Sequence, residues 1–248
     1  MTYALSDFGS YFVGGRVHEV KGRAVEEIAF TAQTRYGYDP NGHYAVEGAY
    51  VQFFVPTRRQ DRPPIVLVHS GGMSGSMWER TPDGRNGWLH ALLARGYEVH
   101  VIDNVERGRA GWAPGLWHGD AILRTMEEAW SLFRFGPPDG FADRRAFAGQ
   151  RFPVNHLETF ARYFVPRWTS TTNAQVAAMS ALLARFDKVS VIAHSQGAAV
   201  ASTAMALAPG RVAAFLALEP SGFTLPESPA VCPPVQLLSG DFLDRDIL

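Results

Sequence analysis

The pentapeptide Ala193-His194-Ser195-Gln196-Gly197 separates two apolar segments of different character. Before it, residues 188–192 (KVSVI) form a short β-branched run, which is typical of a buried strand. After it, residues 198–208 (AAVASTAMALA) are small and mostly apolar and end at a Pro-Gly pair, which is typical of a buried helix. The sequence therefore predicts a strand, a sharp turn with Ser195 at its apex, and a helix.

A serine at such a turn is placed for nucleophilic chemistry. Its hydroxyl is a weak nucleophile at neutral pH and needs a base to take its proton. The strand and the helix pass close together beside the turn, and the small residues Ala193 and Gly197 allow this approach. The N–H of Gln196 would stand at the helix N-terminus, where backbone donors face a developing oxyanion. We expect Ser195 to be the nucleophile and Gln196 an oxyanion donor; the alternative is a tight turn with an incidental serine.

A second motif supports the first. Residues 63–72 (PPIVLVHSGG) read as a strand followed by a glycine-rich loop, similar to the His-Gly-Gly loop of lipases and esterases. In such a loop a backbone N–H supplies the other half of the oxyanion hole. We expect Gly71 to be this donor and Gly72 to let the backbone approach the substrate. His69 is expected to brace the loop rather than act as the base. A glycine-rich turn after a buried strand is the alternative.

A carboxylate follows the next predicted strand, residues 211–218. Glu219 stands at the end of this strand, where it could orient a histidine poised over Ser195. A standard arrangement of this kind places the acid one strand later, and Asp241 and Asp244 follow the candidate strand 235–238. From the residues alone the acid stays open between these positions, and Glu219 could also be a surface side chain.

Taken together, these motifs resemble a small family of bacterial α/β-hydrolase esterases. The resemblance spans nearly the whole chain and is carried by residues 11–17, 49–56, 69–72, 103–111, 193–197 and 219–222. It implies an α/β-hydrolase fold and ester hydrolysis through an acyl-enzyme on Ser195. It also implies Glu219, rather than Asp241 or Asp244, as the acid of the triad.

The base of the triad has no obvious candidate. The chain has 8 histidines, and the last of them is His194. In α/β-hydrolases the histidine follows the acid in the chain. We therefore expect it outside this chain, with the C-terminal part of the fold missing. The alternatives are a substitute histidine, or a binding protein that keeps the pocket but has no base.

The chain divides into a core and an insertion. Alternating strands are predicted at 11–20, 26–32 and 44–55, followed by a strand at 65–68, a helix at 84–95 and a strand at 98–102. Further helices are predicted at 119–134, 155–164 and 173–186. This order predicts a doubly wound, mostly parallel sheet with N-terminal antiparallel strands. Residues 1–111 and 173–248 would form the α/β-hydrolase core, and residues 112–172 a cap.

The predicted cap is rich in aromatic residues and proline. We expect some of these side chains to line an apolar substrate pocket over Ser195, with Trp112, Trp117 and His194 as substrate-binding residues. The alternative is that the aromatic side chains pack only against one another.

Composition excludes several other function classes. The net charge of −1 and pI of about 6.7 favour neither nucleic acid nor an anionic membrane as a partner. Cys232 alone excludes an internal disulfide, no apolar run reaches membrane-spanning length, and the N-terminus does not read as a signal peptide. Neither a metal nor a cofactor is implied. The expected partner is a small-molecule ester. The alternative reactions are those of an amidase, a lactonase or an acyltransferase. A homodimer stays open, and so does the choice between a cytoplasmic and a periplasmic location.

Overall fold

The computed structural model describes residues 2–243, which are built around a seven-stranded sheet in the order β1-β4-β6-β5-β7-β8-β9. The long strands at one edge pair antiparallel: β1 (Leu5–Val20) and β4 (Gly42–Pro56). The other strands run parallel to one another: β5 (Ile65–Val68), β6 (Val99–Asp103), β7 (Val189–His194), β8 (Val212–Leu218) and β9 (Val235–Leu238). The predicted sheet type is confirmed.

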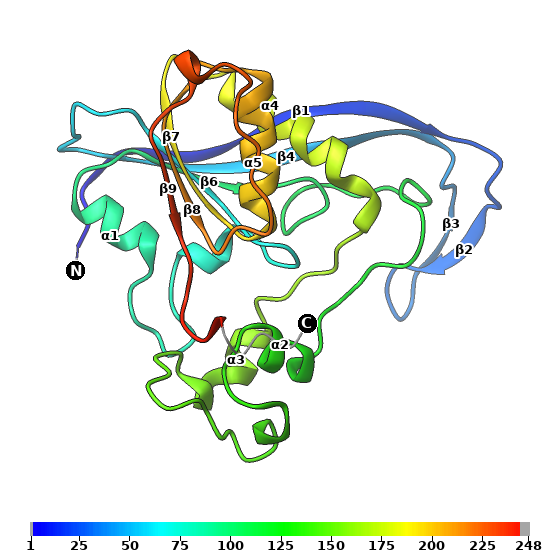
Figure 1. Ribbon diagram of the computed structural model, residues 1–248. Helices are drawn as coiled ribbons and strands as arrows, with labels where there is room; N and C mark the ends of the chain where they lie inside the picture. The colour runs from blue at the N-terminus through cyan, green and yellow to red at the C-terminus, as the bar shows by residue number, and fades with distance from the viewer. Residues whose placement is uncertain (1, 244–248) are drawn as a thin grey trace.

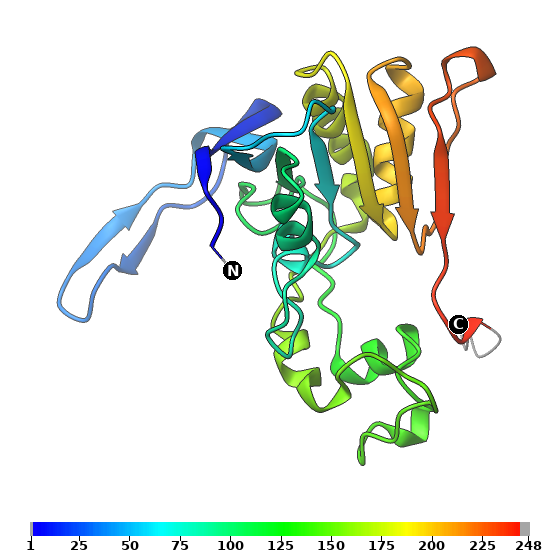
Figure 2. The same ribbon diagram turned by 90° about the vertical axis from the view of Figure 1, so that its left-hand side faces the viewer.

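Helices cover both faces of this sheet (Figures 1 and 2). In β5, Val66 and Val68 pack in the cluster that includes α4 (Thr172–Leu183) and α5 (Gln196–Leu207). The alternate side chains, Ile65 and Leu67, pack in the cluster that includes α1 (Trp88–Ala94). A strand buried on both faces reads as a continuous apolar run because neither set of alternate side chains meets water.

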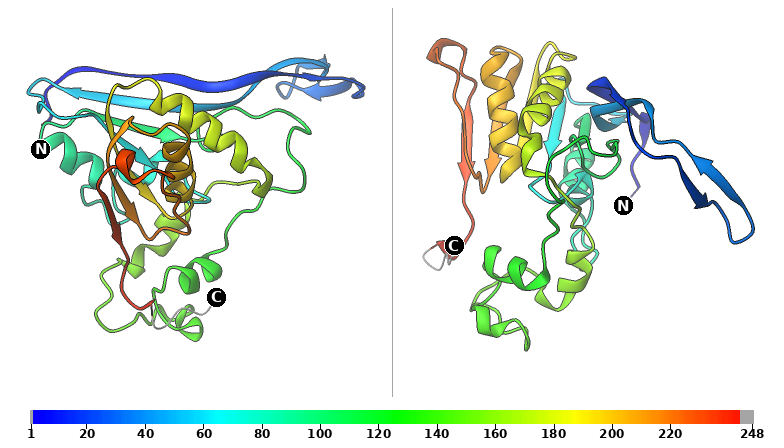
Figure 3. Two further views of the ribbon diagram at one scale, coloured as in Figure 1. Left: turned by 45° about the horizontal axis from the view of Figure 1, so that its top comes forward. Right: turned by 90° about the vertical axis from the view of Figure 1, so that its right-hand side faces the viewer.

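The antiparallel edge differs in detail from the prediction. Strand β1 begins at Leu5 rather than at residue 11, because the edge strand is largely exposed and so needs no regular apolar alternation. The predicted strand 26–32 is shorter: β2 (Glu26–Ala29) and β3 (Arg35–Tyr38) form a hairpin closed by the Phe30 N–H bond to the Thr34 carbonyl. This hairpin projects away from the body of the molecule (Figure 3).

The helical part of residues 112–172 lies below the carboxyl ends of the parallel strands (Figure 2). Their helices are α2 (Met126–Leu132) and α3 (Leu157–Ala161), both shorter than predicted. Helix α2 begins late because Thr125 caps it, accepting the Glu128 N–H at 3.1 Å. The segment has its own buried cluster of Trp130, Phe135 and Leu157. Short 3-10 turns lie at Gly75–Trp78, Pro138–Gly140, Val154–His156, Thr169–Thr171 and Pro229–Val231.

Candidate active site

Ser195 occupies the turn between β7 and α5 in a strained conformation, with φ 51° and ψ −122°. Such a conformation costs about 1–3 kcal/mol for a residue with a side chain. It is held by the Ser195 N–H, which donates to the Leu218 carbonyl at 2.9 Å. A Cβ at Gly197 would overlap the His69 carbonyl oxygen, so only glycine lets the helix start this close to the loop after β5. The predicted turn and its need for a small residue at 197 are confirmed.

The loop after β5 offers backbone donors beside this turn. Within residues 2–243, neither the Gly71 N–H nor the Gly72 N–H has a hydrogen-bond acceptor. Gly72 has φ 70°, a conformation that favours glycine, and its carbonyl accepts the Val165 N–H at 2.9 Å. Gln196 lies at the start of α5, where N–H groups have no intrahelical acceptor. Gly71 and Gln196 are thus available as an oxyanion pair.

Two arginines hold the Gln196 side chain. Its Oε1 accepts from Arg167 Nη1 at 3.3 Å and from Arg107 Nη2 at 3.4 Å. A Cβ at Gly71 would lie 2.6 Å from Arg167 Nη1 and 2.8 Å from Gln196 Oε1, so this group packs directly on the Gly71 backbone. The positive charge of the arginines therefore lies beside the candidate oxyanion donors.

Arg107 is fully buried, which requires a partner. Its Nε donates to Glu106 Oε1 at 3.0 Å, and the second oxygen of Glu106 accepts the Trp168 N–H at 2.7 Å. Burial lowers the pKa of Arg107, and the Glu106 carboxylate opposes this shift. One arginine near Gln196 is thus paired with a carboxylate, while Arg167 has no ion-pair partner among residues 2–243. No sequence motif pointed to Arg167.

His69 braces the loop, as predicted. Its Nε2 accepts the Asn104 N–H at 3.0 Å, so the proton lies on Nδ1, which donates to the Ser70 carbonyl at 2.8 Å. Burial and the nearby Arg107 lower the pKa of His69 to about 4. A neutral imidazole with both nitrogens occupied cannot take the Ser195 proton.

Glu219 directly follows β8, has φ 48° and lines the same cavity as Ser195. Its Oε2 accepts from Arg134 Nη2 of the cap at 2.6 Å, and its Oε1 accepts the Gly240 N–H. Asp241 contributes its backbone carbonyl, which accepts Arg134 Nε at 3.1 Å. Asp244 lies outside the described residues. Arg134 therefore pairs with the Glu219 carboxylate, and this partner was not predicted from the sequence.

His194, which the sequence analysis expects to be a substrate-binding residue, also lines this cavity. Burial lowers its pKa, while the charge of Glu219 opposes the shift. Its Nδ1 is buried without a partner among the described residues. In residues 2–243, no histidine nitrogen forms a hydrogen bond with Ser195 or Glu219.

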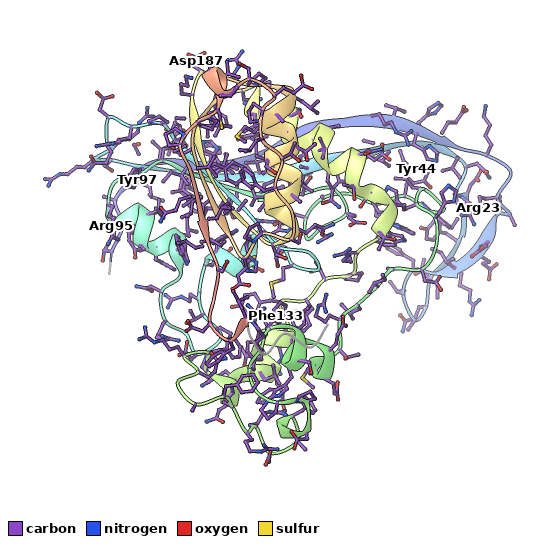
Figure 4. The ribbon with its side chains drawn as sticks, in the orientation of Figure 1. Arg23, Tyr44, Arg95, Tyr97, Phe133 and Asp187 are labelled. Carbon is purple, nitrogen blue, oxygen red and sulfur yellow. The ribbon has the colours of Figure 1, made fainter. Side chains whose placement is uncertain are left out.

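The cavity over Ser195 has a volume of about 430 Å³. Cap side chains form much of its wall, including Phe133, which follows α2 and lies at the edge of the cap that faces the sheet in Figure 4. Trp112 and Trp117, which were expected to be substrate-binding residues, do not line this cavity. Trp112 is 56% exposed over a separate depression, and Trp117 packs on Trp168 with 4.9 Å between ring centroids.

The two tryptophans lie elsewhere because of the course of the connector that leaves the core after β6. Gly111 lies near the Ala45 carbonyl of β4, and Gly115 lies near the Arg23 side chain. The connector therefore follows the antiparallel edge before it reaches the cap, and its tryptophans stay away from the end of β7.

Among the described residues, no cluster of histidine, cysteine, aspartate or glutamate could hold a metal ion. Across residues 2–243, no helix is long and apolar enough to span a membrane.

Comparison with known proteins agrees with this geometry. Residues 65–246 match the model of the α/β-hydrolase family. The chain belongs to this family. A solved bacterial esterase is 32% identical to this chain, and the two structures superpose with a TM-score of 0.82. The match covers 100% of this chain and 80% of the esterase chain. The resemblance to bacterial α/β-hydrolase esterases is thus confirmed.

A probable secreted lipase from a fungal species (strain ATCC 74256) is 29% identical over 199 residues, which are 73% of this chain and 51% of the lipase. The α/β-hydrolase chain thus spans about half the length of this curated relative. The family and these relatives support hydrolase activity.

Proposed function

We propose that this α/β-hydrolase cleaves carboxylic esters through an acyl-enzyme on Ser195. The observation that carries the proposal is that Ser195, in its strained turn, and the Glu219 carboxylate line one cavity. The N–H groups of Gly71 and Gln196 lie on the two segments that meet at this turn. The esterase and lipase relatives support an ester as the substrate class.

Each residue has one role in this proposal. Ser195 Oγ attacks the ester carbonyl carbon and loses its proton to a histidine base, which none of residues 2–243 supplies in contact with Ser195. The Gly71 and Gln196 N–H groups bind the resulting oxyanion, and Glu219 orients the base and stabilises its charged form. The alcohol leaves with the proton, and water then hydrolyses the acyl-enzyme. Arg107 and Arg167 favour the oxyanion through their positive charge.

The test is hydrolysis of p-nitrophenyl acetate by the purified protein. We expect turnover that Ser195→Ala abolishes. Ser221→Ala is the matched control, because Ser221 is exposed and only its backbone N–H contacts the turn, at 3.4 Å from the Ser195 carbonyl. Turnover that persists in Ser195→Ala would contradict the proposal. No turnover in the unmodified protein would favour a pocket protein without a base.

A further inference from the structure

The cavity over Ser195 is walled mainly by apolar side chains from two parts of the fold. The loop after β5 contributes Met73 and Met77, and the cap contributes Leu132, Phe133, Phe152 and Phe160. Apolar walls of this kind stabilise a bound group only when that group is itself apolar, because the favourable free energy comes from removing apolar surface from water. The wall therefore indicates that the part of the ester that occupies the cavity is apolar.

The aromatic part of the wall is preformed. Phe135 and Phe152 stack with 3.9 Å between centroids and 9° between ring planes. Phe160 stands edge-on to both, at 5.8 and 5.0 Å. Trp130 and Leu157 are fully buried in the cluster behind them. Packed rings of this kind keep their positions without a ligand, so no ordering cost falls on binding.

The charged residues around the cavity already have partners, so they offer few hydrogen-bonding groups to a polar part of the substrate. Arg134 and Glu219 pair with each other at 2.6 Å. Arg80 is exposed and donates to the Gly84 carbonyl at 2.9 Å. A charged or strongly polar group buried against the phenylalanines would lose its hydration without a partner.

The volume sets the size of the group. A dry apolar cavity of about 150 Å³ is enough to hold one benzene ring. The cavity over Ser195, at about 430 Å³, is nearly three times larger. Acetyl or methyl groups would leave most of it unfilled, whereas a hexyl-sized or aryl group would contact its walls.

We propose that this enzyme selects esters that carry one bulky, uncharged apolar group, which is bound between the cap phenylalanines and Met73 and Met77. The inference rests on the proposed esterase function. The geometry requires one such group beside the scissile carbonyl, and either the acyl or the alcohol part of the ester can supply it.

The test compares three neutral esters by pH-stat: ethyl acetate, ethyl hexanoate and its isomer hexyl acetate. Each buried methylene raises kcat/KM by about fourfold until the cavity is filled. We expect at least one of the longer esters to exceed ethyl acetate by about tenfold or more. The faster isomer shows whether the acyl or the alcohol part enters the cavity. Equal kcat/KM for all three esters would overturn the inference while leaving the esterase function intact.

Two variants locate the effect. Phe133→Ala removes a wall residue and should lower kcat/KM for the longer ester several-fold more than kcat/KM for ethyl acetate. Leu132→Trp fills the cavity and should reject the longer ester even if Phe133→Ala does not fold. Phe141→Ala is the control, since Phe141 packs on Trp130 in the same cluster but does not line the cavity. An equal loss in the Phe141 variant would assign the effect to cap stability and overturn the inference.

A binding measurement separates this inference from the esterase function. Ser195→Ala cannot form the acyl-enzyme, so calorimetric titration with the same esters reports on the cavity alone. Tighter binding of the hexyl-sized ester than of ethyl acetate supports the apolar site even if the unmodified protein hydrolyses neither. Equal or absent binding of both would overturn it.

Discussion

At Ser195, three neighbours impose the backbone conformation that the chemistry needs. The Leu218 carbonyl accepts the Ser195 N–H, and the Ser195 carbonyl accepts the Ala198 N–H at 3.0 Å. Gly197 brings the helix start against the His69 carbonyl. These contacts offset the strain of the turn, so Ser195, the proposed nucleophile, is held in place before substrate binds. The same reasoning applies to Gln196, whose side chain lies between Arg107 and Arg167.

The first prediction concerns this neutral amide between two positive charges. In Gln196→Glu the new carboxylate pairs with both arginines, so we expect the free energy of unfolding to be kept or raised. The added negative charge beside the oxyanion donors should slow acylation about tenfold or more. Chemical unfolding and the rate of ester hydrolysis measure the two effects.

Gln196→Met is the control for charge, because it removes the acceptor without adding a carboxylate. If Gln196→Glu and Gln196→Met slow the reaction equally, the charge of the arginines has no part in catalysis.

At the scale of elements, the site depends on where strands end. Strands β5, β7 and β8 run parallel, so the loop with Gly71, the turn with Ser195 and the acid Glu219 all meet at one edge of the sheet. The cap lies beyond this edge (Figure 2), and Arg134 joins it to the core through Glu219. A cap residue thus positions the acid of the proposed triad.

The second prediction tests this link. Arg134→Gln should lower the free energy of unfolding by about 1 kcal/mol, because the pair is only partly buried. It should lower kcat more than it raises KM for ethyl acetate, since Glu219 loses the group that holds it. Arg145→Gln is the control, because Arg145 pairs only with exposed carboxylates of the cap. The same kcat loss in both variants would show that the cap, rather than the Glu219 contact, is responsible.

Elements buried on both faces were predictable from sequence because their apolar runs carry a strong signal, as in β5 and β7. The start of α2 was not, because Thr125 caps the helix and residue 122 instead bridges to Arg167. The positions of Trp112 and Trp117 away from the cavity were not predictable, because composition marks a segment as aromatic without determining its path. Arg134 and Arg167 gave no local signal, because their partners, Glu219 and Gln196, are distant in sequence.

At the scale of the whole molecule, buried histidines link stability to pH. The pKa of His69 is lowered to about 4 by burial and by Arg107, and burial also lowers the pKa values of His100 and His194. In the unfolded chain a histidine takes up its proton near pH 6.5. The unfolded state therefore binds more protons as the pH falls below about 6.5, and the folded state is progressively destabilised.

We therefore expect acid to lower the free energy of unfolding through His69. The contribution of His69 is complete above about pH 6.5 and is lost as the pH falls toward about 4, a total of about 3 kcal/mol. Urea unfolding at pH 7 and pH 4.5 measures it. His69→Gln, whose amide can accept from Asn104 and donate to Ser70, should have a shallower pH dependence. An unchanged slope in this variant would contradict the assignment.

We have proposed that Ser195 is a nucleophile held in this cavity. The test is the intact mass of the purified protein before and after treatment with a fluorophosphonate, with Ser195→Ala as control. We predict one adduct per chain, located on the peptide that contains Ser195 and absent from the variant. No adduct on the unmodified protein, or an adduct that persists in Ser195→Ala, would contradict the claim.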